Sequence, residues 1–271
     1  MCGRYASARK RIELLEEFDV QRDVAADDEL APDYNVAPTK PVYAVLNRRP
    51  ASPEDQANEE RDALDERQPD ASERQLRVVR WGLVPFWAKD VKIGSRMINA
   101  RAETLAEKPA FRRAFAVRRC LLPADGYYEW QKQPGSAKQP IYISRKDGHS
   151  LAFAGLYELW RDGSVAKEDA DAFLWTATII TTSAPDELGM IHDRMPMIID
   201  SRKWADWLDP ANGDVADLRT LLTPAAVSGL QTYPVSTDVN SVRNNGPWLI
   251  EPIGAPLTAA GTPQNGTGAL F

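Results

Sequence analysis

Several features that define common classes of protein are missing from this chain of 271 residues. Its two cysteines, Cys2 and Cys120, are too few and too far apart for a disulfide framework, and with His149 and His192 they form no zinc-ligand spacing. No run approaches the roughly 18 apolar residues of a membrane span, and the charged, amphipathic N-terminus does not resemble a signal peptide. We therefore expect a monomeric, cytoplasmic protein that binds no metal or cofactor and does not enter a membrane.

The excess of negative charge is confined to one segment. The chain has a net charge of −6, and residues 50–75 carry nine acidic residues against three Arg, which accounts for all of it. This segment has almost no large apolar residue, so we expect a disordered acidic insertion. Residues 76–145 hold fourteen Lys and Arg against five Asp and Glu, and they are the expected contact surface for a polyanion.

The apolar patterns predict one α+β domain over residues 1–253, with a curved, largely antiparallel β core flanked by short helices, and a flexible tail over residues 254–271. Alternating or β-branched runs predict strands at Val42–Leu46, Leu76–Leu83, Arg119–Leu122, Ile141–Ser144, Leu151–Leu156 and Phe173–Thr182. Helical spacing predicts helices at Arg9–Phe18, Leu105–Ala116, Pro185–Met190, Ser201–Leu208 and Val215–Leu222. Strands and long helices do not alternate, which argues against a doubly wound parallel sheet.

The N-terminus offers a reactive pair of groups. Removal of Met1 would leave Cys2 with a free α-amine and a thiol on neighbouring carbons. An α-amine has a pKa of about 7.7–8.0, so a neutral fraction that attacks aldehydes exists near pH 7. The thiol can then close a five-membered thiazolidine ring on the imine. The alternative is a chance cysteine at position 2.

Aromatic and basic residues are interleaved from the end of the second predicted strand onward. Trp81 and Trp87 bound the run WGLVPFW, and four cations follow: Lys89, Lys92, Arg96 and Arg101. Rings that stack on bases and cations that hold phosphates are typical of single-stranded nucleic-acid binding. The alternative, core tryptophans, applies more to Trp81 than to Trp87.

Two titratable residues lie in settings that suit proton transfer. Glu129 stands between Tyr128 and Trp130, where burial would raise its pKa; the alternative is a structural ion pair with an Arg. His192 stands in a predicted loop, as catalytic groups often do; the alternative is a hydrogen-bonded structural His. His149 lies in a turn and is expected to be merely exposed.

Seven motifs in order resemble the SOS response-associated peptidase family, the abasic-site DNA–protein crosslink proteins. They are MCGRY, YNVAPT, RWGLVPFWAK, NARAET, CLLPADGYYEW, IHDRMPMII and VSTDVNSVRNNGP. The resemblance covers Met1 to about Pro252 and implies the family's single α+β domain with a positively charged DNA groove. The acidic insertion departs from the family pattern.

The resemblance also implies roles for individual residues. Cys2 corresponds to the crosslinking nucleophile, Asn99 to the residue that positions the open sugar, Glu129 to the acid at the amine, and His192 to the residue that assists ring opening and reversal. The residues implied to contact DNA are Arg4, Trp81, Trp87, Arg101 and Arg194. The implied partner is single-stranded DNA that contains abasic sites.

Two other functions remain open from the sequence. A peptidase or amidohydrolase with Cys2 as N-terminal nucleophile would also need a free N-terminus, but it would turn over an amide in trans. A non-catalytic single-strand binder would use the basic, aromatic middle of the chain and would have no need of Cys2.

Overall fold

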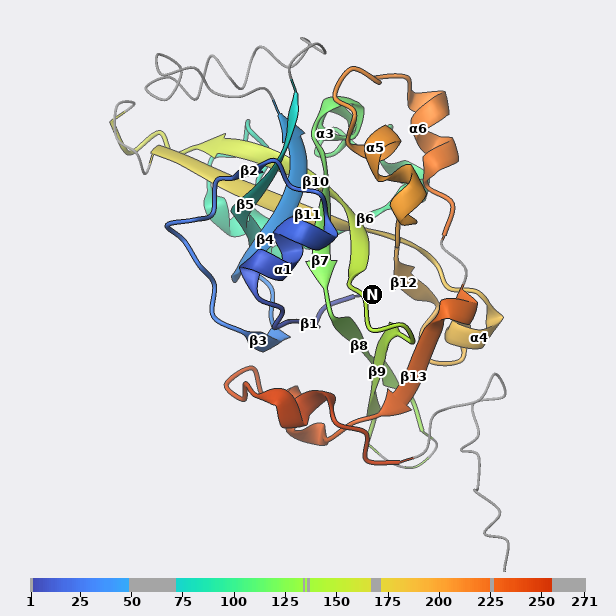
Figure 1. Ribbon diagram of the computed structural model, residues 1–271. Helices are drawn as coiled ribbons and strands as arrows, with labels where there is room; N and C mark the ends of the chain where they lie inside the picture. The colour runs from blue at the N-terminus through green and yellow to red at the C-terminus, as the bar shows by residue number, and fades with distance from the viewer. Residues whose placement is uncertain are drawn as a thin grey trace, which may run out of the picture.

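A closed β-barrel forms the centre of the molecule (Figure 1). The computed structural model describes residues 2–48, 72–133, 135, 137–166, 172–224 and 227–254. The strands are β1 (Tyr5–Ser7), β2 (Arg22–Asp23), β3 (Asp33–Val36), β4 (Pro41–Arg48), β5 (Glu73–Trp81), β6 (Asn99–Arg101), β7 (Arg119–Ala124), β8 (Gly126–Gln131), β9 (Gln139–Arg145), β10 (Leu151–Arg161), β11 (Phe173–Ser183), β12 (Arg194–Pro196) and β13 (Leu230–Pro234). The α-helices are α1 (Arg11–Glu17), α3 (Arg112–Val117), α4 (Asp186–Gly189), α5 (Trp204–Leu208) and α6 (Val215–Leu221), and the 3-10 helices are η2 (Val91–Arg96), η3 (Ala102–Thr104), η5 (Ser201–Lys203), η6 (Val227–Gly229), η7 (Thr237–Asn240) and η8 (Pro247–Ile250).

Five strands close the barrel in the order β11-β10-β7-β4-β5, and β5 returns to β11. The first four neighbouring pairs are antiparallel. A ring with an odd number of strands cannot be antiparallel throughout, so one pair has to be parallel. That pair is β11 and β5, which meet where Thr176 lies opposite Arg80 and Ala177 opposite Trp81.

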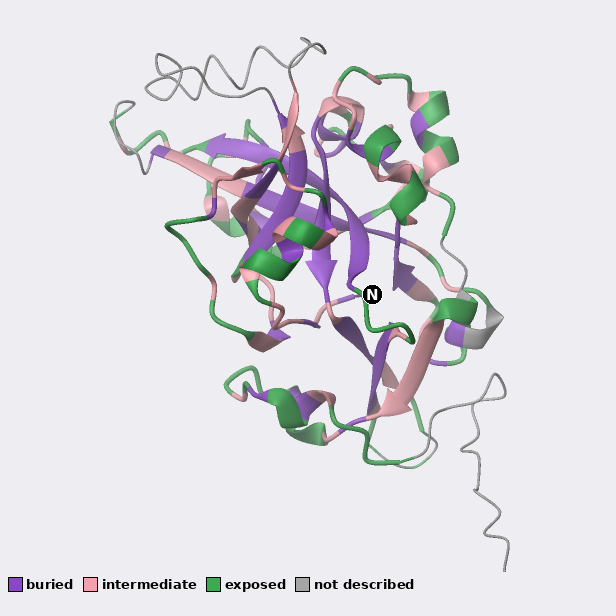
Figure 2. Ribbon diagram, viewed as in Figure 1, coloured by how far each residue is buried: buried purple, intermediate pink, exposed green. Residues whose placement is uncertain are grey.

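The two faces of the barrel strands belong to two apolar clusters, because successive side chains of a strand point to opposite faces. Leu121 packs in a cluster that includes Leu14 of α1 and Leu218 of α6, so this cluster lies outside the barrel under the helices. Cys120 and Leu122 belong to the other cluster, which fills the interior. Figure 2 shows the barrel strands buried over most of their length, while α1 and α6 expose one side.

A second, antiparallel sheet in the order β13-β9-β8-β1-β3 continues from the end of the barrel. The chain passes from β7 into β8 through Asp125, whose Oδ2 accepts a hydrogen bond from the Ala8 amide at 2.6 Å. Gly126 follows, and a Cβ there would lie 2.6 Å from the carbonyl oxygen of Ile143 and collide with the Tyr142 ring. This close packing of β8 on β9 brings β1, and with it the N-terminus, onto the end of the barrel.

The segment 82–98 leaves the barrel and returns to the same strand. β5 ends at Trp81, opposite Ala177, and β6 begins at Asn99, opposite Ile179, so both strands pair with one edge of β11. Gly82 makes the departure with a φ of 126°, a left-handed conformation that favours glycine. Asn99 is therefore held at a fixed position on the barrel rim.

The chain is a single α+β domain, as predicted, and its sheets contain parallel as well as antiparallel pairs. Each of the six predicted strands is present, and all six extend beyond the expected range at one or both ends, although β5 ends at Trp81, two residues earlier than predicted. The predicted helix Leu105–Ala116 is wrong in its first half, because Pro109 disfavours helical backbone at Lys108 and α3 begins only at Arg112. The predicted insertion extends too far, since Glu73–Gln75 pair with β4 and Gln75 is fully buried. Residues 50–71 and most of the predicted tail lie outside the described residues.

Candidate active site

Cys2 lies in the interior cluster at the end of the barrel and is fully buried. Its carbonyl oxygen accepts a hydrogen bond from Asn99 Nδ2 at 2.7 Å. Asn99 reaches this position because β6 is aligned on β11, whereas Cys2 reaches it because β1 is aligned on β8. The hydrogen bond therefore joins the two sheets at the nucleophile candidate.

Glu129 approaches Cys2 from β8. Its side chain is buried, and burial raises the pKa of its carboxyl group despite the opposing influence of His192. Burial, and next the charge of Glu129, raise the pKa of the Cys2 thiol. Two residues earlier on the same face of β8, Tyr127 is also buried beside Cys2 and Glu129. A carboxyl group that stays protonated more readily than usual suits proton transfer.

His192 lies between α4 and β12 with its side chain about one third exposed. Its Nδ1 lies 2.9 Å from the backbone amide of Arg194, a donor, and 2.8 Å from Oδ1 of Asp193, an acceptor. One ring nitrogen cannot accept and donate at once, and the fixed amide outweighs the solvent-exposed Asp193 carboxylate. Nδ1 is then the acceptor and Nε2 carries the proton of the neutral ring. When the ring is protonated, its positive charge opposes the rise in the pKa of Glu129 that burial causes, so the imidazole lies on the Glu129 side of the site.

The four predicted site residues Cys2, Asn99, Glu129 and His192 thus converge from four separate parts of the chain. Sequence reasoning missed the two tyrosines beside the thiol, Tyr5 and Tyr127. Both are fully buried, and the charge of Cys2 raises the pKa of each after the larger effect of burial. The hydroxyl of Tyr5 finds no hydrogen-bond partner among the described residues. Only the period-two alternation of Tyr127 with Glu129 could have indicated one of them.

The three predicted phosphate-binding arginines differ in their surroundings. Arg101 is exposed at the end of β6. Arg194 has both terminal nitrogens engaged by Glu103, at 2.6 and 3.1 Å, and Nη2 also donates to the carbonyl of Thr181 at 2.6 Å. The hydrogen bond from Arg194 lowers the pKa of Glu103, so Glu103 stays negatively charged and largely neutralises Arg194. Arg4 is half-buried and held by neutral acceptors.

The two tryptophans of the predicted DNA-facing run have opposite positions. Trp81 is fully buried, its Nε1 donates to the carbonyl of Ile98 at 2.9 Å, and its ring packs edge-on against Tyr5. The expectation that Trp81 contacts DNA is therefore wrong for this conformation, and the core alternative holds. Trp87 is 50% exposed, and Phe86 beside it is 49% exposed. The exposed aromatic surface of this run is formed by Phe86 and Trp87.

Part of the basic excess of residues 76–145 is buried, so the expectation that this whole segment forms a contact surface for a polyanion is corrected. Arg118 is buried in an ion pair with Glu158. Arg119 is buried and donates to main-chain carbonyls at the C-terminal ends of α3 and α5. The surface cations that remain near the exposed aromatics include Lys89, Lys92, Arg96 and Arg112, and the Arg113 guanidinium lies 5.1 Å from the Phe86 ring centroid.

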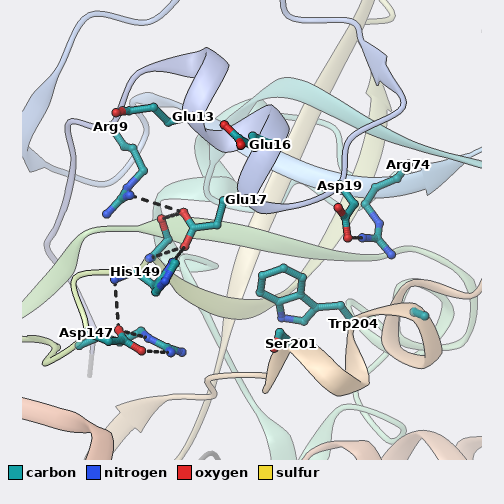
Figure 3. A pocket seen from close by; sticks show the side chains of 13 residues that line it. Arg9, Glu13, Glu16, Glu17, Asp19, Arg74, Asp147, His149, Ser201 and Trp204 are labelled. Atoms are coloured by element: carbon teal, nitrogen blue, oxygen red, sulfur yellow. Dashed lines mark hydrogen bonds and ion pairs between the residues drawn. The ribbon is translucent and has the colours of Figure 1, made fainter.

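A polar cavity of about 790 Å³ lies away from this site, between α1, the β9–β10 turn and α5 (Figure 3). His149 lines it, with a side chain 65% exposed and Nδ1 3.2 Å from Glu17. Glu17 also accepts hydrogen bonds from the amide and hydroxyl of Ser150, so the charged groups here largely satisfy one another.

Over the described ranges no cluster of three His, Cys, Asp or Glu is arranged to hold a metal ion. Within the same ranges no helix is long and apolar enough to cross a membrane.

Comparison with known proteins gives a consistent set of relatives. The family model described as "SOS response associated peptidase (SRAP)" matches residues 1–242. Abasic site processing protein YoqW of Bacillus subtilis is 39% identical over 253 residues, covering 93% of this chain and 99% of that protein. Abasic site processing protein HMCES of Gallus gallus is 33% identical, covering 82% of this chain and 66% of that protein. A crystal structure of a protein from Bacteroides thetaiotaomicron superposes with a TM-score of 0.72 at 27% identity, covering 93% of this chain and 99% of that chain.

Proposed function

Because the chain belongs to the SOS response-associated peptidase family, we propose that it processes abasic sites by capturing their aldehyde on Cys2 in a covalent DNA–protein crosslink. The proposal rests on one observation above the others. Asn99 holds the Cys2 backbone by a 2.7 Å hydrogen bond while the buried Glu129 lies beside the thiol. A nucleophile, a positioning amide and an acid are thereby within one small volume.

The reaction balances without an oxidant or reductant. Hydrolysis of the Met1–Cys2 peptide bond gives Cys2 a free α-amine. The neutral amine adds to the open-chain aldehyde of the abasic sugar, and loss of water gives an imine. The thiol sulfur then adds to the imine carbon while its proton passes to the nitrogen, which closes the thiazolidine ring.

The surrounding residues supply the proton transfers. Glu129, whose pKa is raised by burial, donates the proton that leaves with the water molecule. His192, with Nε2 as the proton-bearing nitrogen, assists opening of the sugar ring, because only the open form carries an aldehyde. By microscopic reversibility the same group assists release. Asn99 keeps the Cys2 backbone, and with it the amine, in a single orientation.

The DNA partner is a single strand containing the abasic site. Phe86 and Trp87 offer exposed rings on which unpaired bases can stack, and Arg101 offers a cation at the rim next to Asn99. Arg4 lies two residues from the nucleophile. Duplex DNA would bury its bases and leave these rings without partners.

The test is incubation with a single-stranded oligonucleotide treated with uracil-DNA glycosylase, followed by denaturing electrophoresis and intact-mass measurement. We expect an adduct that forms without borohydride and a mature protein that lacks Met1. Cys2→Ala should lose the stable adduct, whereas Cys2→Ser should give at most a reversible imine. A protein that retains Met1 and still crosslinks would overturn the role of the Cys2 amine.

The same experiment separates the two other functions. A peptidase of the N-terminal-nucleophile kind needs a thiolate, and burial raises the pKa of the Cys2 thiol, which disfavours that form. Turnover of a peptide in trans without a DNA adduct would nevertheless support it. A non-catalytic binder would retain full DNA affinity in Cys2→Ala and give no adduct in the wild type.

A further inference from the structure

Asn35 in β3 is a fully buried residue that joins the N-terminal strand to the C-terminal segment. Its Nδ2 donates to the carbonyl oxygens of Ser241 and Asn244, both at 2.9 Å, and more weakly to Val239 at 3.3 Å. Its Oδ1 accepts a hydrogen bond from Arg4 Nη1 at 2.6 Å. Every polar atom of this amide is therefore used, and one of them is used on Arg4.

The Arg4 guanidinium is fixed along one edge and left open at another. Nη1 donates to Asn35 and also to the carbonyl of Val239 at 2.9 Å, and the guanidinium carbon lies 5.9 Å from the centroid of the Trp130 ring. Nε is buried without a hydrogen-bond partner in the described parts of the chain. No hydrogen bond to a described residue engages Nη2. A planar guanidinium held at one nitrogen has the direction of its remaining donors defined.

The acceptors that hold Arg4 are neutral, so they orient the guanidinium without cancelling its charge. Arg194 is oriented by the carboxylate of Glu103, which cancels its charge. Arg4 is oriented by an amide and a carbonyl, and within the described ranges no carboxylate forms an ion pair with it. Burial lowers the pKa of Arg4 and the charge of Asp33 opposes this, but the Asp33 carboxylate is itself paired with Lys40 at 2.6 Å. An aspartate at position 35 could accept the same hydrogen bond, but it would neutralise the cation. Asparagine orients Arg4 and leaves its full charge for a ligand.

The main chain of Arg4 lies beside the nucleophile, while its guanidinium lies over the Trp130 ring. The Arg4 backbone amide lies near the Cys2 thiol, where it opposes the rise in the thiol pKa that burial causes, and the Arg4 carbonyl accepts a hydrogen bond from the Tyr128 amide at 3.0 Å. The main chain of Arg4 is thereby attached to the site, and its side chain is attached to Asn35. A displacement of the guanidinium would be transmitted to both.

We propose that Asn35 is a positioning residue that holds the Arg4 guanidinium, which no described carboxylate pairs with, ready for a DNA phosphate. The inference rests on the proposed function for the identity of the anion. The C-terminal segment takes part because its carbonyls fix Asn35. Asn35 therefore acts on DNA binding through Arg4 and through no contact of its own.

The experiment is a double-mutant cycle on binding of an intact, non-abasic single-stranded oligonucleotide over a series of salt concentrations. Asn35→Ala should weaken binding by about two- to tenfold, the effect of freeing one long side chain that binding must order again. Its salt dependence should match the wild type, because the charge of Arg4 remains. Arg4→Ala should reduce the slope of log K against log salt by about 0.7, the value for one phosphate contact on a single strand. Asn35→Ala should then have no further effect in the Arg4→Ala background.

Asn245→Ala is the matched control. Asn245 ties the same two segments together, accepting from the Tyr34 amide at 2.8 Å and donating to the Pro32 carbonyl at 3.0 Å, but it does not touch Arg4. It should bind DNA like the wild type. An equal loss of affinity in Asn245→Ala, or a loss in Asn35→Ala that persists without Arg4, would overturn the proposal.

If Asn35→Ala does not fold, Arg4→Lys carries the test. Lysine keeps the charge but has no planar fork, so affinity should fall with an unchanged salt slope. Wild-type affinity in Arg4→Lys would overturn the proposal. Failure of the proposed function is a separate result, because it would appear as absence of an adduct with abasic DNA while the cycle on intact DNA stays measurable.

Discussion

Glu129→Gln should make the protein more stable at neutral pH and less able to crosslink. Burial raises the pKa of Glu129 above its unfolded value of about 4.3. A group of this kind contributes stability that is fully present below the unfolded pKa and is lost as pH rises through the folded pKa. At neutral pH the carboxylate is therefore a net cost, which the neutral glutamine removes while keeping the shape of the side chain.

The size of both effects follows from the 4% exposure of Glu129. An incompletely compensated buried polar group costs about 1–3 kcal/mol. One kcal/mol corresponds to about 2–4 °C in Tm for a chain of this size, so the variant should melt a few degrees higher at pH 7. Loss of a general acid–base group lowers rates by about 10²- to 10⁴-fold, and adduct formation should slow within this range.

The assay combines thermal unfolding between pH 4 and 8 with a time course of adduct formation. Glu103→Gln is the control. The hydrogen bond with Arg194 lowers the pKa of Glu103, so the charged form of Glu103 stabilises the fold, whereas the charged form of Glu129 destabilises it. That contribution is present above about pH 4.3 and is lost as pH falls. With Glu103 about half exposed, the control should lose under about 1 kcal/mol at neutral pH. A Glu129→Gln protein that is less stable than the wild type at pH 7 would refute the reasoning, since the carboxylate would then be stabilised by its surroundings.

Four further predictions concern residues whose positions the structure defines. Trp81→Phe should cost about 1–3 kcal/mol in urea unfolding, from the lost hydrogen bond and reduced packing, with DNA affinity retained; weaker DNA binding by the folded variant would contradict this. Trp87→Ala should lower affinity for single-stranded DNA by about 1–3 kcal/mol in fluorescence anisotropy and leave stability unchanged; unchanged affinity would exclude stacking. Arg119→Ala, which strands main-chain carbonyls at two helix ends, should cost about 3–5 kcal/mol in urea unfolding, and a cost under 1 kcal/mol would refute that role. His192→Ala should slow both formation and release of the adduct in paired time courses, and wild-type release would exclude its shared role.

Strands with a strong internal pattern could be predicted from the sequence, and weakly patterned ones could not. Phe173–Thr182 is β-branched along most of its length, and β11 is present there. The three-residue strands β1 and β6 were missed because they exist only through pairing with β8 and β11, a tertiary effect. β6 carries Asn99, and β1 fixes the short segment that leads to Cys2, so the geometry of the Cys2–Asn99 hydrogen bond could not be predicted from local pattern.

The candidate site residues could be predicted from their chemistry and from the family resemblance, but the directions of the neighbouring side chains could not. Trp81 and Trp87 belong to one run, yet Trp81 closes the barrel and Trp87 is on the excursion beyond it. Only the strand register at Ala177 decides which ring is inside. Net charge was similarly misleading for Arg118 and Arg119. Arg118 pairs with the buried carboxylate of Glu158 and Arg119 donates to main-chain carbonyls, so neither adds positive charge to the surface.

The return of segment 82–98 to the strand it left has an evolutionary consequence. Its two ends are fixed opposite Ala177 and Ile179, neighbouring positions on one face of β11, and Leu83 and Val84 are buried against the barrel, so only the exposed part around Phe86 and Trp87 is left free of the core. Changes confined to this exposed part would leave Asn99 and the Cys2 hydrogen bond in place. Relatives could therefore acquire new DNA-structure preferences through substitutions at Phe86 and Trp87, while the crosslinking chemistry stays the same.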